Sequence, residues 1–297
     1  MRGLDHVLLT RFNLPSPGHE ALLRTQEGWL KQRVVLFERY CLPSVKAQTC
    51  QDLKWIIYFD PHSPDWLCNR IAAWRRFEVL TPIFRATVSR DEMQQDILSI
   101  IKHPQTEILT TNLDNDDALA VDTVARLQAT PCTGSRTAIY LERGLVRRGN
   151  DVFLHRDPRN AFCSVRENWD APVFCWAAQH RRLDAIMSVR TIGGAPGWLQ
   201  VVHGTNVSNR VHGSLVDPGN YRSQFAGLLD DLPDLHWRRK VADAGLIRPV
   251  RFLRETLRLS AKLVLYRLFG DDGLDRGKAA WTLILRRLTS GVGTSGS

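Results

Sequence analysis

Three carboxylates lie within four residues at Asp114, Asp116 and Asp117, in the segment LDNDDAL. Between apolar residues such a cluster is electrostatically unfavourable unless a positive group shares the site. A hard divalent cation meets that need, because it takes carboxylate oxygens and completes its shell with water and a substrate phosphate. The alternative is a solvated acidic turn at the start of a helix over residues 117–121, where acids are favourable. The segment alone leaves both interpretations open.

A second polar segment, HGTN, begins at His203 and follows the apolar stretch 199–202, which reads as a strand. A neutral imidazole can complete a carboxylate-rich metal site, so His203 is a candidate for the third ligand. His212 is a competing candidate, and a histidine that follows a strand is also commonly structural. The acidic segment is what favours a functional role for His203.

Short apolar segments alternate with helical patterns over the first 235 residues, which predicts an α/β fold with a mixed sheet flanked by helices. Each strand candidate ends in polar residues, and ligands of open α/β sheets bind beyond the carboxyl ends of the strands. The functional site is therefore expected at these ends. The strand candidates are residues 6–10, 54–59, 77–80 and 107–110, and apolar residues at helical spacing cover 29–45 and 66–74.

The positive charge is concentrated towards the C-terminus. The chain of 297 residues has a net charge of +9, and its last 60 residues account for +8. This predicts a near-neutral domain over residues 1–235 and a basic helical extension over residues 236–297, with different roles. A uniformly basic nucleic-acid-binding protein would distribute its charge differently, so no nucleic-acid partner is expected.

Within the extension, residues 248–269 carry Arg and Lys at helical spacing beside apolar residues. Two interpretations stay open: a helix that lies on an anionic membrane surface, and a helix that packs on the body. The longest apolar run has six residues, too short to span a membrane. The protein is therefore expected in the cytoplasm, with peripheral attachment to the inner face of the membrane if the helix binds lipid. Six cysteines without a CxxC spacing predict reduced, mostly buried thiols.

Four segments in this order resemble a known family: TRFN (10–13), LPSVKAQTCQDLKWIIYFD (42–60), LDNDDAL (113–119) and VVHGTNVSN (201–209). Over residues 5–215 the chain resembles the putative rhamnosyltransferase family of bacteria, which is related to nucleotide-sugar glycosyltransferases of the GT-A type. The resemblance implies a GT-A-like fold and a nucleotide-sugar donor.

The resemblance also implies roles for single residues. It implies that Arg11 and Asp60 contact the nucleotide, and that Asp114 and Asp116 hold Mn²⁺ or Mg²⁺ together with the donor diphosphate. It implies that His203 is the later metal ligand. Asn206, in the loop that follows, is expected to bind substrate.

The catalytic base is the open part of this interpretation, because no clear match exists to the Glu-Asp pair with which many inverting relatives place theirs. Glu167 is one candidate, since it follows an expected hairpin of residues 138–141 and 152–155. Asp170 and Asp117 are the others. The alternatives are an ion pair with a neighbouring Arg for Glu167 and a helix cap for Asp117.

The function expected from the sequence is metal-dependent transfer of a sugar, with rhamnose as the implied one, from a nucleotide-sugar to a glycan or glycolipid acceptor of the envelope or capsule. The alternative is a non-catalytic module that binds a nucleotide or carbohydrate and carries a basic tail for a membrane surface or nucleic acid.

Overall fold

The computed structural model describes residues 3–15, 28–203 and 211–250, and the chain divides into two compact units, residues 1–236 and 237–297. The described part of the second unit consists of helix α7 (Trp237–Ala242) and a π-helical turn at Asp243–Ile247. Asn206, and all but the first three residues of the predicted basic helix 248–269, lie outside the described residues. Among those described, no helix is both long and apolar enough to cross a membrane.

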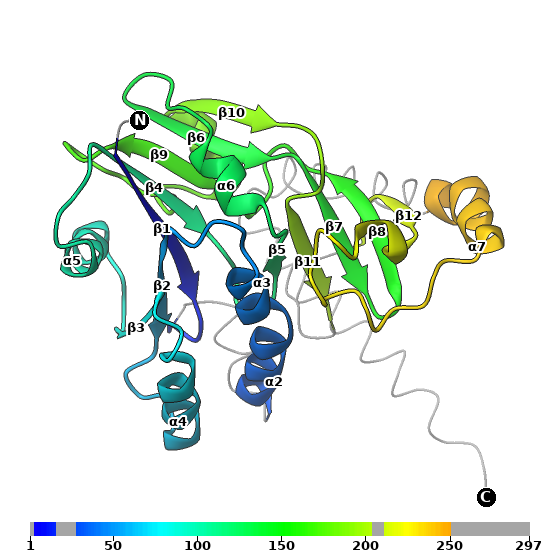
Figure 1. Cartoon of the computed structure of the whole chain (residues 1–297), viewed down its shortest axis with the longest axis horizontal. Coiled ribbons are helices and arrows are strands. Elements are labelled where there is room, and N and C mark those ends of the chain that lie inside the picture. The colour runs from blue at the N-terminus through cyan, green and yellow to red at the C-terminus, as the bar shows by residue number, and fades with distance from the viewer. Residues whose placement is uncertain (1–2, 16–27, 204–210, 251–297) are drawn as a thin grey trace, which may run out of the picture. The chain divides into compact units, whose positions relative to one another are not determined.

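The first unit is built on a seven-stranded sheet with the strand order β10-β6-β9-β4-β1-β2-β3 (Figure 1). Strands β3, β2, β1 and β4 are parallel neighbours, and β9 runs antiparallel between β4 and β6. The carboxyl ends of β1, β2 and β4 therefore meet at one edge of the sheet. The strands are β1 (Leu4–Arg11), β2 (Lys54–Phe59), β3 (Leu80–Phe84), β4 (Glu107–Asn112), β6 (Arg136–Leu141), β9 (Ser164–Asn168) and β10 (Ser188–Ile192).

A second sheet of five strands has the order β12-β8-β7-β11-β5. Its hairpin joins β7 to β8 through a two-residue turn whose first residue, Gly149, has a φ of 57°, a conformation that favours glycine. The predicted hairpin was wrong in one arm, because residues 138–141 belong to β6 of the large sheet. The strands are β5 (Ala118–Leu119), β7 (Arg143–Arg148), β8 (Asp151–Arg156), β11 (Trp198–Val202) and β12 (Ser214–Val216).

Alternating side chains of the large sheet enter two different cores. Leu8 of β1 packs with residues of the helical segment that begins at α2, whereas its neighbours Val7 and Leu9 pack with α5 and with Phe174. The expected mixed sheet flanked by helices is thus confirmed. The helices of this unit are α2 (Trp29–Leu36), α3 (Leu42–Lys46), α4 (Asp65–Trp74), α5 (Arg90–Ile100) and α6 (Thr123–Gln128), with a π-helical turn at Phe37–Cys41 and 3₁₀ turns at His180–Ala185 and Pro218–Tyr221.

Within the described residues of the first unit, the elements predicted from periodicity are found, with two exceptions. The strand expected at 77–80 begins only at Leu80. The helix expected at 117–121 is wrong, because Ala118 and Leu119 pair with β11 and α6 begins only at Thr123. A two-residue strand leaves no periodicity to read. All six cysteines are free, as expected, and three of them are buried.

The buried histidine of β1 makes the stability of the fold depend on pH. His6 Nε2 lies 2.9 Å from Thr111 Oγ1, and burial, together with the charge of Arg166, lowers the pKa of His6 to about 3. Above pH 6.5 the ring is neutral in both the folded and the unfolded chain. As the pH falls from about 6.5 towards 3, only the unfolded chain takes up this proton, so stability decreases by up to about 1.4 kcal/mol per pH unit from this group.

Urea unfolding of the wild type and of His6→Gln between pH 4 and 7.5 measures this effect. Other groups titrate in both proteins, so the difference between the two slopes isolates His6. Below pH 6.5 we expect the free energy of unfolding of the variant to change less steeply with pH than that of the wild type. The difference should correspond to the uptake of about one proton. Equal slopes would show that the ring is protonated in the folded protein.

Candidate active site

The acidic segment leaves the carboxyl end of β4 and is fastened to the end of β1. Thr10 Oγ1 donates to the carbonyl of Leu113 (2.7 Å), and the side chain of Asn115 donates from Nδ2 to the carbonyl of Phe12 (2.6 Å). Asn115 is therefore a structural residue between the two acids of the D-x-D. It fixes the turn from which Asp114 and Asp116 project.

Asp116 is the centre of a charged cluster drawn from three elements. Its Oδ2 accepts from Arg33 of α2 at 2.5 Å and lies 2.8 Å from Nε2 of His203, which follows β11. Burial disfavours the charged carboxylate, but the hydrogen bond from His203 and the positive charge of Arg33 outweigh it and lower the pKa of Asp116. The side chains of all three are at most 14% exposed. Asp116 is thus held as a carboxylate in a largely closed site.

Asp114 carries the unbalanced charge of the cluster. Asp114 is an exposed residue, but loss of hydration where the protein surrounds its carboxyl group, followed by the negative charge of Asp116, raises its pKa to about 6. Its Oδ1 accepts a hydrogen bond from Asn112 (3.3 Å), and the positive charges of Arg33 and Arg11 oppose the rise only in part. A further cation beside Asp114 would favour its ionised form.

Asp117 is directed into the protein. Its Oδ1 accepts from the backbone N–H of Val201 at 2.9 Å, and the residue is 1% exposed. Burial, and then the charges of Asp116 and Asp114, raise its pKa well above the usual range. The predicted role as a base does not fit this position, because a substrate hydroxyl has no access to the carboxylate. Asp117 instead fastens the acidic turn to β11, two residues before His203.

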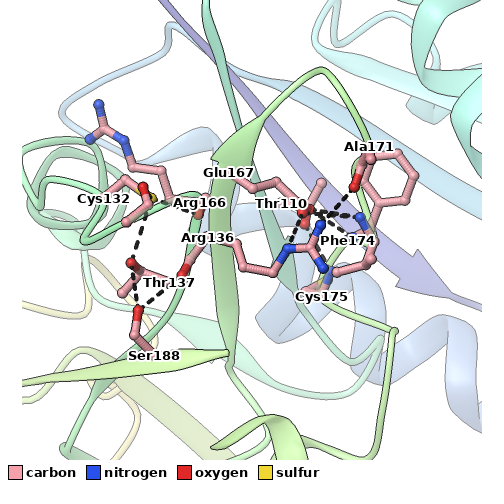
Figure 2. A network of polar contacts seen from close by, with 12 residues as sticks. Thr110, Cys132, Arg136, Thr137, Arg166, Glu167, Ala171, Phe174, Cys175 and Ser188 are labelled. Carbon is pink, nitrogen blue, oxygen red and sulfur yellow. Dashed lines mark hydrogen bonds and ion pairs between the residues drawn. The ribbon is translucent and has the colours of Figure 1, made fainter. Parts of the chain in front are cut away.

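Glu167 lies at the opposite end of β4 from the acidic segment, opposite Ile108 in the pairing of β9 with β4. Its carboxylate accepts the backbone N–H groups of Val173 and Phe174 and lies 3.4 Å from Nε of Arg136 (Figure 2). The residue is 1% exposed. The prediction of Glu167 as the base is therefore corrected: the ion-pair alternative describes it, because β9 runs away from the site.

The two predicted nucleotide contacts, Arg11 and Asp60, end neighbouring parallel strands. The backbone N–H of Asp60 donates to Asn13 Oδ1 (3.0 Å), which joins the two strand ends. The guanidinium of Arg11 lies over the ring of Trp176, 4.0 Å from its centroid. Both residues lie at the same sheet edge as the acidic segment, as expected from the strand order.

His212, the competing histidine, stacks on His155 with the ring centroids 5.3 Å apart and does not contact Asp116. Of the two histidines, the structure brings His203 to the acidic cluster.

The fit of a divalent cation is partial. Within the described residues no group of three or more His, Cys, Asp or Glu side chains is arranged to hold a metal ion. The expected ligands Asp114, Asp116 and His203 thus do not form one set around a common point. His203 is instead a hydrogen-bond partner of Asp116, and Asp114 accepts a hydrogen bond from Asn112. Mg²⁺ is commonly bound through one or two carboxylates plus phosphate and water. Asp114 and Asp116 fit that simpler donor set, because the two carboxyl groups project from one turn.

Two residues of this site escaped the sequence analysis. Arg33 lies in a helical segment that is otherwise read as apolar. A basic partner could have been predicted, because three neighbouring carboxylates need positive charge close by. Trp176 belongs to the longest apolar run, residues 173–178, which reads as core. Its indole N–H donates to Asn112 Oδ1 (2.7 Å), beside the acidic segment.

Ligands of open α/β sheets bind beyond the carboxyl ends of the strands, which is where the acidic segment of this unit lies. Comparison with known families defines the chain further. It belongs to the family described as putative rhamnosyl transferase, whose model matches residues 5–215.

Solved structures resemble the chain only distantly. S. aureus TarS is 9% identical, with 67% of this chain and 37% of that chain covered and a TM-score of 0.41. A TarS fragment in complex with UDP is 10% identical, with 67% and 60% covered and a TM-score of 0.41. The inositol-1-phosphate CTP transferase from T. maritima is 8% identical, with 78% and 100% covered and a TM-score of 0.38. The chain thus spans about two-fifths to three-fifths of the TarS chains it matches. No curated protein matches it.

Proposed function

We propose that this chain is a metal-dependent glycosyltransferase that moves a sugar from a nucleotide-sugar donor to a glycan or glycolipid acceptor. The sugar proposed is rhamnose, the one that the description of its family names. The observation that carries the proposal is the pair of acids that follows the carboxyl end of β4, an exposed Asp114 beside a buried Asp116 that Arg33 and His203 contact, in a chain of this family. Two carboxylates this close in one turn repel each other, and a cation would balance their charge.

In the proposed reaction Asp114 and Asp116 would hold Mn²⁺ or Mg²⁺, and the bound ion would supply positive charge for the departing diphosphate. Arg33 keeps Asp116 ionised, and its guanidinium supplies positive charge at the same place. His203 orients the carboxylate of Asp116 through its ring nitrogen. Arg11 and Asp60, at neighbouring strand ends, lie at the sheet edge where the nucleotide is expected.

The acceptor is proposed on chemical grounds alone. A lipid-linked or envelope glycan would place the enzyme at an anionic membrane surface, which suits the excess of Arg and Lys in residues 248–269. We include peripheral attachment through that segment in the proposal.

One observation favours the second candidate, a non-catalytic nucleotide-binding module. Two of the three predicted bases, Glu167 and Asp117, are buried and hydrogen-bonded to backbone N–H groups, and the third, Asp170, is exposed two residues beyond the end of β9. An inverting transferase needs a base that reaches the acceptor hydroxyl. Binding without turnover would therefore support the module.

A thermal-shift panel of nucleoside diphosphates, with and without Mn²⁺, tests donor binding and its metal dependence. We expect one nucleotide to stabilise the protein in the presence of Mn²⁺ and to stabilise it much less in EDTA, because the ion links Asp114 and Asp116 to the diphosphate. At 100 times the dissociation constant the gain is about 2.7 kcal/mol, which corresponds to a rise in Tm of several degrees.

The control is Mn²⁺ alone, which separates binding of the ion from binding of the nucleotide. The same stabilisation by a nucleotide in EDTA would contradict the metal dependence. No stabilisation by any nucleotide under either condition would contradict the proposed function.

A further inference from the structure

Residues 173–176 cross one face of the large sheet on a row of polar side chains. Phe174 N–H donates to the carboxylate of Glu167 at 2.8 Å, Cys175 N–H donates to Thr110 Oγ1 at 2.9 Å, and Trp176 Nε1–H donates to Asn112 Oδ1 at 2.7 Å. The first two contacts are visible in Figure 2. Glu167 lies opposite Ile108 of β4, so the three acceptors advance along β4 two residues at a time, on one face of the sheet. The segment therefore leads from the far end of the sheet to the edge of the active site.

The start of this segment is held in an unusual conformation. Phe174 has a φ of 63°, in the left-handed region that non-glycine residues rarely adopt. Such a conformation persists where the surroundings over-determine it, and it clusters at functional sites. Here Glu167 accepts both N–H groups around the bend, and Arg136 donates from Nη2 to the carbonyl of Ala171 (2.7 Å). The bend sets where the next three residues lie.

The segment places the indole ring of Trp176 in contact with Arg11. The guanidinium of Arg11 lies 4.0 Å from the centroid of the indole ring, within the range of a cation–π contact. Arg11 is exposed at the end of β1, and Asn112, which accepts from the indole of Trp176, also donates to Asp114 Oδ1 at 3.3 Å. Without the ring, a long side chain at this exposed position would sample many rotamers.

We propose that Trp176 is a positioning residue, which holds the guanidinium of Arg11 beside Asp114 for the diphosphate of the donor, and that Glu167, Thr110 and Asn112 fix the place of Trp176. This inference rests on the proposed function, because it assumes an anionic donor at this edge. Arg11 is a cation, so the partner proposed for it is the anionic diphosphate rather than the nucleobase. Glu167, far from the acidic cluster, thereby acts on donor binding.

Isothermal titration with inorganic pyrophosphate and with the best nucleoside diphosphate, both with Mn²⁺, measures the contribution of Trp176. We expect Trp176→Leu to weaken binding of both probes by about fivefold, the range of a cation–π contact and the order it imposes. Trp176→Phe keeps an aromatic face and should restore most of the affinity. In donor turnover, KM should rise for Trp176→Leu while kcat stays within about twofold.

The matched control is Trp169→Leu. Trp169 lies seven residues earlier and donates its indole N–H to Asp5 Oδ2 at 3.0 Å, at the opposite end of β1 from Arg11. Its replacement should leave both affinities unchanged. A loss of equal size in this variant would show a general structural effect and overturn the proposal.

Glu167→Gln separates positioning from base catalysis. Positioning predicts a raised donor KM with kcat nearly unchanged, whereas loss of a base predicts a large fall in kcat with donor binding retained. The second pattern would overturn the proposal.

The remaining outcomes distinguish this inference from the proposed function. Wild-type affinity in Trp176→Leu, or a loss confined to the nucleoside probe, overturns the positioning role alone. Failure of the wild type to bind either probe overturns both.

Discussion

Asp116→Ala is expected to abolish sugar transfer while the fold is retained. The substitution removes the carboxylate with which Arg33 and His203 both form hydrogen bonds, and this carboxylate is one of the two proposed metal ligands. A loss of at least about 1,000-fold in kcat, or about 4 kcal/mol of transition-state stabilisation, follows if the ion bears the charge of the departing diphosphate. Turnover of the matching nucleotide-sugar, measured as released nucleoside diphosphate, gives this number.

Asp122→Asn is the matched control for that variant. Asp122 lies six residues further on, pairs with Arg126 at 3.6 Å and is 46% exposed, so its replacement should leave kcat unchanged. Circular dichroism and Tm of both variants establish that each is folded. Undiminished turnover in Asp116→Ala would remove this residue from the mechanism.

Arg166→Met is expected to have the largest effect on stability. Arg166 of β9 pairs with Glu107 of β4 through Nε (3.0 Å) and Nη2 (2.5 Å), and Nη1 donates to the carbonyls of Gln128 and Thr130. Both charged residues are at most 9% exposed. Removing the guanidinium leaves a buried carboxylate without this partner, which typically costs 3–5 kcal/mol, about the range we expect from urea unfolding.

Two comparisons make this result specific. The double variant Arg166→Met/Glu107→Leu should recover part of the loss, because no buried charge is left behind. Arg90→Met removes an exposed guanidinium 3.4 Å from Asp91 and should have no measurable effect. A loss below about 1 kcal/mol for Arg166→Met would show that water reaches Glu107 and that the pair is effectively a surface one.

The sequence predicted the sheet well because its strands are buried. Residues 54–59 form β2 as predicted, and the polar residues that end β1, β2 and β4 meet at one edge because these strands are parallel. Periodicity and strand-end polarity were enough to predict the sheet edge at which Asp114 and Asp116 lie, and their role as the site stays a prediction.

Glu167 and Asp117 were predicted as catalytic bases because the spacing of residues in the sequence does not show in which direction a strand runs. Glu167 follows an apolar stretch just as Asp114 does, but β9 runs antiparallel to β4 and takes Glu167 to the far end of the sheet. Asp117 was read as a helix cap or a base, whereas pairing of Ala118 and Leu119 with β11 turns its carboxylate inward. Both outcomes depend on contacts far apart in the sequence.

Arg33 and Trp176 were missed for the same reason. Each lies in an apolar pattern that reads as core, and only contacts across about 80 residues for Arg33 and Asp116, and 64 for Trp176 and Asn112, bring them to the site. The one local indication was that the acidic segment needs positive charge nearby, and the sequence analysis attributed that charge to a metal ion alone.

The most direct test of the central claim is turnover of a panel of nucleotide-sugars, including a rhamnose donor, by the wild-type protein with Mn²⁺ and with excess EDTA. We predict release of nucleoside diphosphate from one donor with Mn²⁺, its loss in EDTA and its return when Mn²⁺ is restored. A donor that binds but is never turned over, or turnover undiminished in EDTA, would contradict a metal-dependent glycosyltransferase.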